Sequence, residues 1–218
     1  MICGIDEAGR GPVLGPLVVA GVAVDSDVPL RHLNVRDSKK LSPDRRELLA
    51  PQIEDISTYE VLVIPAAQID VMRAEMSLNE FEARLFAQII EKLHPDIAYV
   101  DAVDVDEIEF KRAVQKHLPF DVEIVSQHEA DNLFPVVSAA SILAKVRRDA
   151  EMRKIEEEFG QPTGSGYPSD PDTIAFLEKW IKEKASLPPH TRTTWDTARR
   201  LLAESRNRKL DEFGDGKA

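Results

Sequence analysis

Four acidic side chains stand where predicted strands of the chain end. Asp6 and Glu7 follow the first apolar run, and Asp101 and Asp131 follow two later ones. Ligands of open α/β sheets gather at strand ends, where groups from distant parts of the chain meet. Crowded carboxylates repel one another, so they need protons or cations to stay together. Mg²⁺ and similar hard cations take oxygen ligands, and two of them about 3.5–4 Å apart can clamp a phosphodiester displacement.

Simpler explanations exist for two of these acids. Asp131 taken alone is equally suited to capping a helix that starts near Pro135. Asp101 belongs to a run of six acids between Asp96 and Glu109 that contains no Lys or Arg, which could be a solvated surface.

The adjacent pair Asp6-Glu7 is harder to explain as ordinary surface. An acidic pair beside a buried strand costs stability unless it is paired or binds metal. Neighbouring strand residues point to opposite faces, so both can serve one site only if the strand breaks at Asp6. The glycines at positions 9 and 11 permit such a break.

Other polar residues could contact a nucleic-acid substrate. Gly9-Arg10-Gly11 offers backbone N–H groups and one guanidinium, which suit a phosphate. Lys145 lies among apolar residues of a predicted helix, so we expect it to have a partner or a ligand. Tyr167 lies in a loop rich in Gly and Pro, where its ring could stack on a sugar or base and its hydroxyl could meet a 2′-OH. Alternatively, Tyr167 packs the C-terminal part onto the rest of the chain.

Composition narrows the class of protein. The 218 residues carry a net charge of −11, which argues against a generally adhesive nucleic-acid binder but not against a local basic groove. The single cysteine, Cys3, excludes an internal disulfide framework and a zinc site built from several cysteines. The start of the chain does not resemble a signal peptide, and the longest run without charge, residues 11–24, falls short of the roughly 18 residues of a membrane span. We therefore expect a cytoplasmic protein that does not bind membranes.

Apolar runs and helix signals predict an α/β domain followed by a helical part. Ser77 and Glu80 form a capping box before the clearest amphipathic helix, which should end at His94-Pro95. A long helix is predicted over 135–159, with Gly160 at its C-terminal cap. Strands are predicted at 1–4, 17–24, 58–64, 97–100 and 122–125, other helices at about 105–117, 172–184 and 194–205 and after Ser42, and a polar tail at 207–218.

The motifs, taken in order, resemble those of the type 2 ribonucleases H, the ribonuclease HII family. The opening signature is Gly-Ile-Asp-Glu-Ala-Gly-Arg-Gly-Pro at 4–12, and the second motif is Asp-Ser-Lys-Lys-Leu at 37–41. The match continues at 99–101, 130–131, 137–146 and 164–170. The surroundings of Asp131 and the segment Arg-Thr-Thr-Trp at 192–195 resemble the archaeal branch. No catalytic position departs from the family pattern.

The resemblance implies a ribonuclease H-like fold, with a mixed five-stranded sheet flanked by helices and a small helical C-terminal domain. It implies an endonuclease that hydrolyses the RNA strand of RNA–DNA hybrids and cuts 5′ of ribonucleotides embedded in duplex DNA, leaving 5′-phosphate and 3′-hydroxyl ends. Asp6, Glu7, Asp101 and Asp131 would be the catalytic carboxylates and would bind two Mg²⁺ or Mn²⁺ ions. One ion would activate a water, and the other would stabilise the departing 3′-oxygen.

The resemblance also implies substrate contacts and a division into domains. The ribonucleotide and the RNA–DNA junction would be recognised by the backbone of Gly9, Arg10 and Gly11 and by Tyr167. Further contacts with the substrate or the active site would come from Lys39, Lys40, Ser141 and Lys145. Residues 1–160 would form the catalytic domain, residues 161–206 a helical substrate-binding domain, and residues 207–218 a flexible tail.

Other functions and a further partner stay open. A DNA recombinase or resolvase of the same fold would share the carboxylates but would not need Tyr167 to read ribose. A non-catalytic module that binds hybrids would not need all four acids. In the tail, Leu210 and Phe213 have the spacing of peptides that bind a sliding clamp, although a disordered polar tail is the simpler interpretation. A monomer is the default expectation.

Overall fold

The computed structural model describes residues 1–35, 41–103 and 106–214, and only the backbone of residues 208–214. A five-stranded sheet has the order β3-β2-β1-β4-β5. Its strands are β1 (Ile2–Ala8), β2 (Leu17–Val24), β3 (Thr58–Ile64), β4 (Ile97–Asp101) and β5 (Glu123–Gln127). Strand β1 pairs antiparallel with β2 and parallel with β4, and β4 pairs parallel with β5. The sheet is therefore mixed, and the predicted fold class is confirmed.

The helices match most of the predicted ones. They are α1 (Val28–His32), α2 (Pro43–Ile56), α3 (Ala66–Glu75), α4 (Leu78–Leu93), α5 (Glu107–Lys116), α6 (Ala130–Leu133), α7 (Pro135–Phe159), α8 (Pro171–Lys184) and α9 (Asp196–Gly214). Helix α7 has the predicted bounds, and Gly160 follows it with a φ of 63°. Ser77 caps α4 by accepting a hydrogen bond of 3.2 Å from the backbone N–H of Glu80. Helices α1, α3 and α6 were not predicted. Helix α9 continues past the predicted end at Ser205, so the backbone of residues 207–214 is helical.

The chain forms two compact units. The first contains Met1–Ala8, Leu17–Val63 and Glu75–Asp149, and the second contains Gly9–Pro16, Ile64–Ala74 and Ala150–Ala218. The second unit thus combines the segment after β1 and most of α3 with the C-terminal helices.

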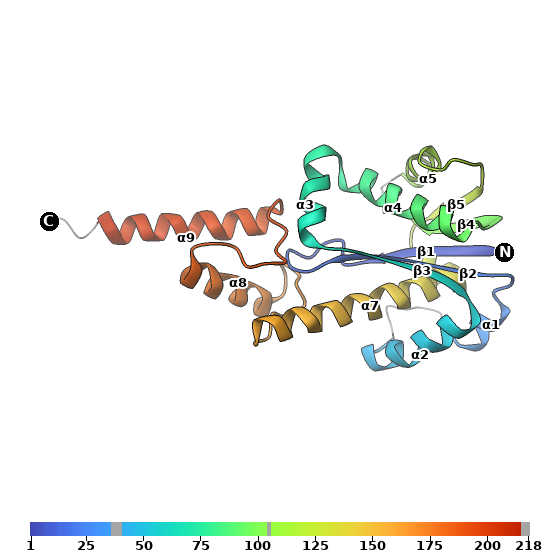
Figure 1. Cartoon of the computed structure of the whole chain (residues 1–218), viewed down its shortest axis with the longest axis horizontal. Coiled ribbons are helices and arrows are strands. Elements are labelled where there is room, and N and C mark those ends of the chain that lie inside the picture. Colours follow the sequence, from blue (N-terminus) through green and yellow to red (C-terminus); the bar gives the residue numbers. More distant parts are fainter. Residues whose placement is uncertain (36–40, 104–105, 215–218) are drawn as a thin grey trace. The chain divides into compact units, whose positions relative to one another are not determined.

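In the first unit, α4 and α5 cover one face of the sheet, and α2 and α7 cover the other (Figure 1). Two glycines allow the helices to approach closely. A Cβ on Gly4 would collide with the backbone of Val136 in α7, and a Cβ on Gly21 would collide with the side chain of Ile89 in α4. The strands must therefore bury small residues there, which fixes α7 directly over β1.

The second unit has its own apolar core. The end of α7, helix α8 and helix α9 contribute most of it, and Val13 and Leu14 join it from the segment after β1. Leu14 forms an isolated β-bridge with Thr191, and this bridge ties the segment to the loop before α9. In the described part of the chain, no helix combines the length and the apolar character needed to cross a bilayer.

Candidate active site

Asp6 and Asp101 lie on the same face of adjacent strands. Ile5 of β1 pairs with Val100 of β4 in parallel register, and the register continued by one residue sets Asp6 beside Asp101. Gly4 packs against α7, so Asp6, two residues later, shares the α7 face. Tyr99 of β4 packs against the cluster that includes α7, and Asp101 follows it by two residues. The alternation of side chains thus directs both carboxylates towards α7.

Helix α7 places two polar residues beside this acidic pair. Ser141 is fully buried and Lys145, one turn later, is half-buried. The ammonium of Lys145 donates a hydrogen bond of 2.6 Å to Oγ of Ser141. This contact agrees with the expectation that a lysine on this apolar stretch has a partner.

Asp131 directly follows Ala130, whose backbone contacts Asp101. The backbone N–H of Ala130 donates a hydrogen bond of 2.9 Å to Oδ1 of Asp101. Asp131 itself is only 1% exposed and lies in the first turn of α6. It does not cap α7, because α6 and then Phe134 separate it from Pro135. The capping explanation for Asp131 was therefore wrong.

Burial and a like charge perturb Asp6. The side chain is 4% exposed, and burial, followed by the charge of Asp101, raises the pKa of Asp6 from 3.8 to about 7. Ser141, Lys145 and the backbone N–H of Glu7, which donates a bond of 2.7 Å to Oδ1, act in the opposite direction. The carboxylate of Asp6 is thus held in a fixed orientation while its negative charge is poorly compensated.

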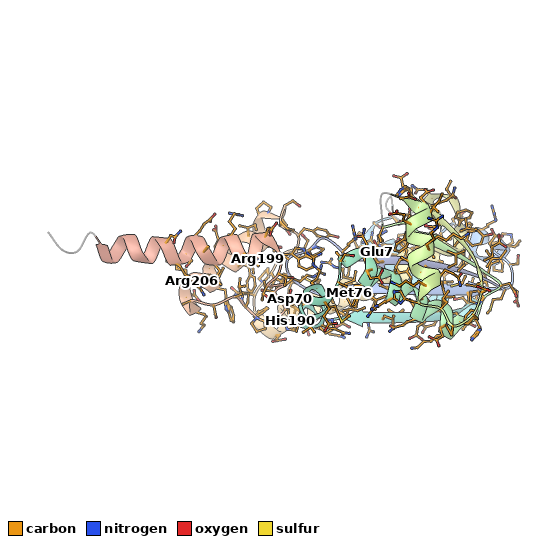
Figure 2. All side chains as sticks on the ribbon, turned by 90° about the horizontal axis from the view of Figure 1, so that it is seen from above. Glu7, Asp70, Met76, His190, Arg199 and Arg206 are labelled. Carbon is orange, nitrogen blue, oxygen red and sulfur yellow. The ribbon has the colours of Figure 1, made fainter. Side chains whose placement is uncertain are left out.

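Glu7 occupies a different position from the one expected. Strand β1 does not break at Asp6 but stays paired with β2 as far as Ala8, opposite Val18. The alternation of side chains along β1 therefore places Glu7, which is labelled in Figure 2, on the opposite face of the strand from Asp6. The prediction of a strand break was wrong because pairing with β2 stabilises the extended backbone through both acids.

The donor set fits a cation with an open coordination shell. A divalent ion would offset the repulsion between Asp6 and Asp101, and Mg²⁺ needs only one or two carboxylates besides water and substrate oxygens. Within the described residues, no three Asp, Glu, His or Cys side chains are close enough to hold a metal ion together. The structure thus brings together an acidic pair with Ser141 and Lys145, but not a closed cage of four carboxylates.

A second cluster lies in the second unit, around Gly9, Arg10 and Gly11. A Cβ on Gly11 would lie 3.5 Å from Cε1 of Tyr167, so the tyrosine ring stands directly beside this glycine. Tyr167 is 38% exposed, which favours contact with a ligand over a role in the core. Lys39 and Lys40, the other predicted substrate contacts, lie outside the described residues.

One residue of this cluster was not predicted from the sequence. Arg192 is fully buried, and its guanidinium donates hydrogen bonds to the carbonyl oxygens of Gly9, Arg10 and Gly15. No spacing rule identifies such an arginine, because its partners are backbone atoms that lie far away in the sequence. The only signal was its place in the segment Arg-Thr-Thr-Trp.

The chain is similar to known proteins over nearly its whole length. A family model described as Ribonuclease HII matches residues 3–198. The chain is 49% identical over 213 residues to Ribonuclease HII of Methanoregula boonei, and the alignment covers 98% of this chain and all of that protein. The chain belongs to the ribonuclease HII family. It is accordingly an endoribonuclease, a hydrolase of the ribonuclease H type.

Solved structures show the same relationship. The ribonuclease H2 of Pyrococcus horikoshii is 41% identical with a TM-score of 0.88, covering 94% of this chain and 98% of that one. The ribonuclease HII of Archaeoglobus fulgidus, solved in a PCNA:RNase HII complex, is 44% identical with a TM-score of 0.86, covering 92% and 96%. A more distant Bst-RNase HIII, solved in complex with Mn²⁺, shares the fold at 22% identity, with a TM-score of 0.82 and coverage of 94% and 70%.

Proposed function

We propose that this enzyme hydrolyses the RNA strand of RNA–DNA hybrids and cuts 5′ of ribonucleotides embedded in duplex DNA, leaving 5′-phosphate and 3′-hydroxyl ends. The observation that carries the proposal is the acidic pair Asp6 and Asp101, held on one face of adjacent parallel strands beside Ser141 and Lys145. Two carboxylates so close together, one of them buried, repel each other and destabilise the folded protein. A divalent cation bound for phosphodiester hydrolysis would offset this repulsion.

The carboxylates are the proposed metal ligands. Asp6, Asp101 and Asp131 would hold Mg²⁺ or Mn²⁺. The family motif also includes Glu7, but its place on the opposite face of β1 sets it apart from these three carboxylates. When bound, two such ions supply an activated water for in-line attack and positive charge against the departing 3′-oxygen. Ser141 and Lys145 orient the carboxylate of Asp6, and the ammonium adds positive charge to a site that would otherwise repel a phosphodiester.

Recognition of ribose is the proposed role of the second cluster. The N–H groups of residues 9–11 suit a phosphate, and the exposed side chain of Tyr167 suits stacking on a sugar or base. Lys39 and Lys40 would contact the substrate backbone. A resolvase of the same fold would have no use for a ribose-reading tyrosine, so the position of Tyr167 beside Gly11 favours the ribonuclease.

A duplex that carries one ribonucleotide tests the proposal. The duplex is incubated with the enzyme and Mg²⁺ beside an otherwise identical all-DNA duplex, and the products are separated at single-nucleotide resolution. We expect one cut, 5′ of the ribonucleotide, with a 5′-phosphate on the downstream fragment. Equal cutting of both duplexes would refute the reading of ribose.

The proposal also covers a protein partner of the tail, the cellular location of the enzyme and its domain boundaries. We propose that Leu210 and Phe213 bind a sliding clamp, which the PCNA complex of the Archaeoglobus fulgidus protein supports. The proposed setting is the cytoplasm, as a monomer that removes ribonucleotides during DNA replication. The divisions at 160 and 206 are proposed as functional boundaries between catalysis, substrate binding and the tail.

A further inference from the structure

Arg192 donates three side-chain hydrogen bonds to one backbone segment. Its guanidinium donates to the carbonyl oxygen of Gly9, to that of Arg10 at 2.8 Å and to that of Gly15 at 3.1 Å. The side chain is fully buried, and removing a guanidinium from water is costly. The guanidinium is planar and rigid, so its three hydrogen bonds fix the path of the segment Gly9–Pro16.

The direction of these carbonyls determines where the N–H groups point. In a trans peptide the C=O of one residue and the N–H of the next point in opposite directions, and the described peptide bonds are trans. Because the carbonyls of Gly9 and Arg10 face Arg192, the N–H groups of Arg10 and Gly11 face away from it. Gly9 has a φ of 86°, and successive N–H groups beside such a residue form a concave site for an anion.

Tyr167 is attached to the same segment. The backbone N–H groups of Val13 and Leu14 donate to the carbonyl of Gly166 at 2.8 and 3.2 Å, and the ring of Tyr167 lies against Gly11. The backbone N–H of Arg192 also donates to the carbonyl of Val13 at 2.8 Å. Arg192 and the loop that carries Tyr167 therefore hold the same backbone segment.

The segment that carries Arg192 is itself anchored. Thr193 and Thr194 each donate a backbone and a hydroxyl hydrogen bond to the carboxylate of Asp70 in α3. Figure 2 labels Asp70. The guanidinium of Arg192 also lies 5.0 Å from the ring centre of Trp195. The residues that follow Arg192 in the sequence are thus themselves fixed in place, and they hold the arginine beside its carbonyl partners.

We propose that Arg192 is a positioning residue for ribose recognition. It fixes the backbone of residues 9–11 so that two N–H groups and the ring of Tyr167 are arranged before the substrate binds. Arrangement in advance lowers the entropy cost of binding and sharpens discrimination. The inference rests on the proposed function and adds a residue to it.

Binding to two matched duplexes tests the inference. Fluorescence anisotropy measures the affinity for a duplex with one ribonucleotide and for its all-DNA equivalent, with Ca²⁺ in place of Mg²⁺ to suppress cutting. We expect Arg192→Met to lower the ratio of the two affinities at least fivefold. Arg73→Met is the matched control, because the Arg73 guanidinium also lies over Trp195, at 5.5 Å, but from the exposed surface of α3. This control should keep the wild-type ratio.

Two further measurements separate positioning from mere stability. The Mg²⁺ concentration for half-maximal cutting should stay unchanged in Arg192→Met, since a general loss of structure would alter metal dependence as well. Arg192→Lys keeps the charge but not the fork, so it should lower the affinity ratio at least threefold, and it decides the matter if Arg192→Met does not fold. A wild-type ratio in Arg192→Lys overturns the inference and leaves the proposed function intact. Absence of any preference in the wild-type enzyme would instead overturn the proposed function.

Discussion

Replacing Asp6 with asparagine should stabilise the metal-free protein while destroying its proposed chemistry. The Asp6 carboxylate is 4% exposed, and burial with the charge of Asp101 raises its pKa from 3.8 to about 7. Between these values the folded protein holds a proton that the unfolded chain has released. The contribution of Asp6 to stability is therefore fully present below pH 3.8, falls as the pH rises, and is lost above about pH 7.

The size of the effect follows from the shift. Each pKa unit corresponds to about 1.36 kcal/mol, so a shift of roughly three units costs the folded state about 4 kcal/mol at pH 8. In the wild type, the backbone N–H of Glu7 donates to Oδ1 of Asp6. Asparagine removes the charge but keeps an oxygen that can accept this hydrogen bond. We expect Asp6→Asn to raise the free energy of unfolding by about 2–4 kcal/mol at pH 8, and by only about 1–2 kcal/mol at pH 5.

The assay is urea unfolding followed by circular dichroism, in EDTA, at both pH values. Asp70→Asn is the control. Burial raises the pKa of Asp70, but hydrogen bonds from Thr194 and Thr193 outweigh it and lower the pKa below its usual value. The charged carboxylate therefore stabilises the fold, and Asp70→Asn should destabilise the protein at pH 8. Mg²⁺ should stabilise the wild type more than Asp6→Asn, because the cation binds the carboxylate. The prediction is refuted if Asp6→Asn is no more stable than wild type at pH 8, or if its gain does not depend on pH.

Other changes to the chain test the site, the core and the tail. Asp131→Asn should lower kcat about 100-fold or more yet leave the affinity for substrate nearly unchanged in anisotropy, because it removes a metal ligand rather than a groove contact; a large loss of affinity would contradict this. Tyr167→Ala should lose about 1–3 kcal/mol of binding to the ribonucleotide duplex, with metal affinity in calorimetry unchanged; equal weakening of Mg²⁺ binding would show that the role is misassigned. Burial strongly raises the pKa of Cys3, so a thiol reagent should label it only after unfolding, and labelling of the native protein would disprove its inertness. Deleting residues 207–218 should abolish binding to a sliding clamp in surface plasmon resonance, and an unchanged affinity would end that proposal.

Elements with strong local signals were predictable. Helix α7 was predicted from its apolar residues and from Gly160, and α4 from its capping box and periodicity. Helix α3 was missed because it buries only Ala66 and Ile69, too few residues to give a periodic pattern. The end of β1 was misplaced because acidic residues usually mark a strand end, whereas here pairing with β2 extends the strand through Glu7 to Ala8.

Some residues of the candidate site could be predicted from the sequence, and others could not. Asp6 and Asp101 were predictable because parallel strands bring their ends together, and both residues follow apolar runs. The face on which Glu7 lies depends on the extent of the β1–β2 pairing, which local sequence does not determine. Arg192 could not be identified because its partners, the carbonyls of residues 9, 10 and 15, are common to every residue type and carry no sequence signature.

The proposed chemistry requires carboxylates from separate strands and helices to bind divalent cations together. Crystals grown with Mn²⁺, measured at the manganese absorption edge, test this requirement, because anomalous differences locate the ions independently of the protein. We expect Mn²⁺ bound to both Asp6 and Asp101, with Asp131 completing the site. Manganese bound elsewhere, or full occupancy that leaves Asp6 without a metal contact, would contradict the proposed chemistry.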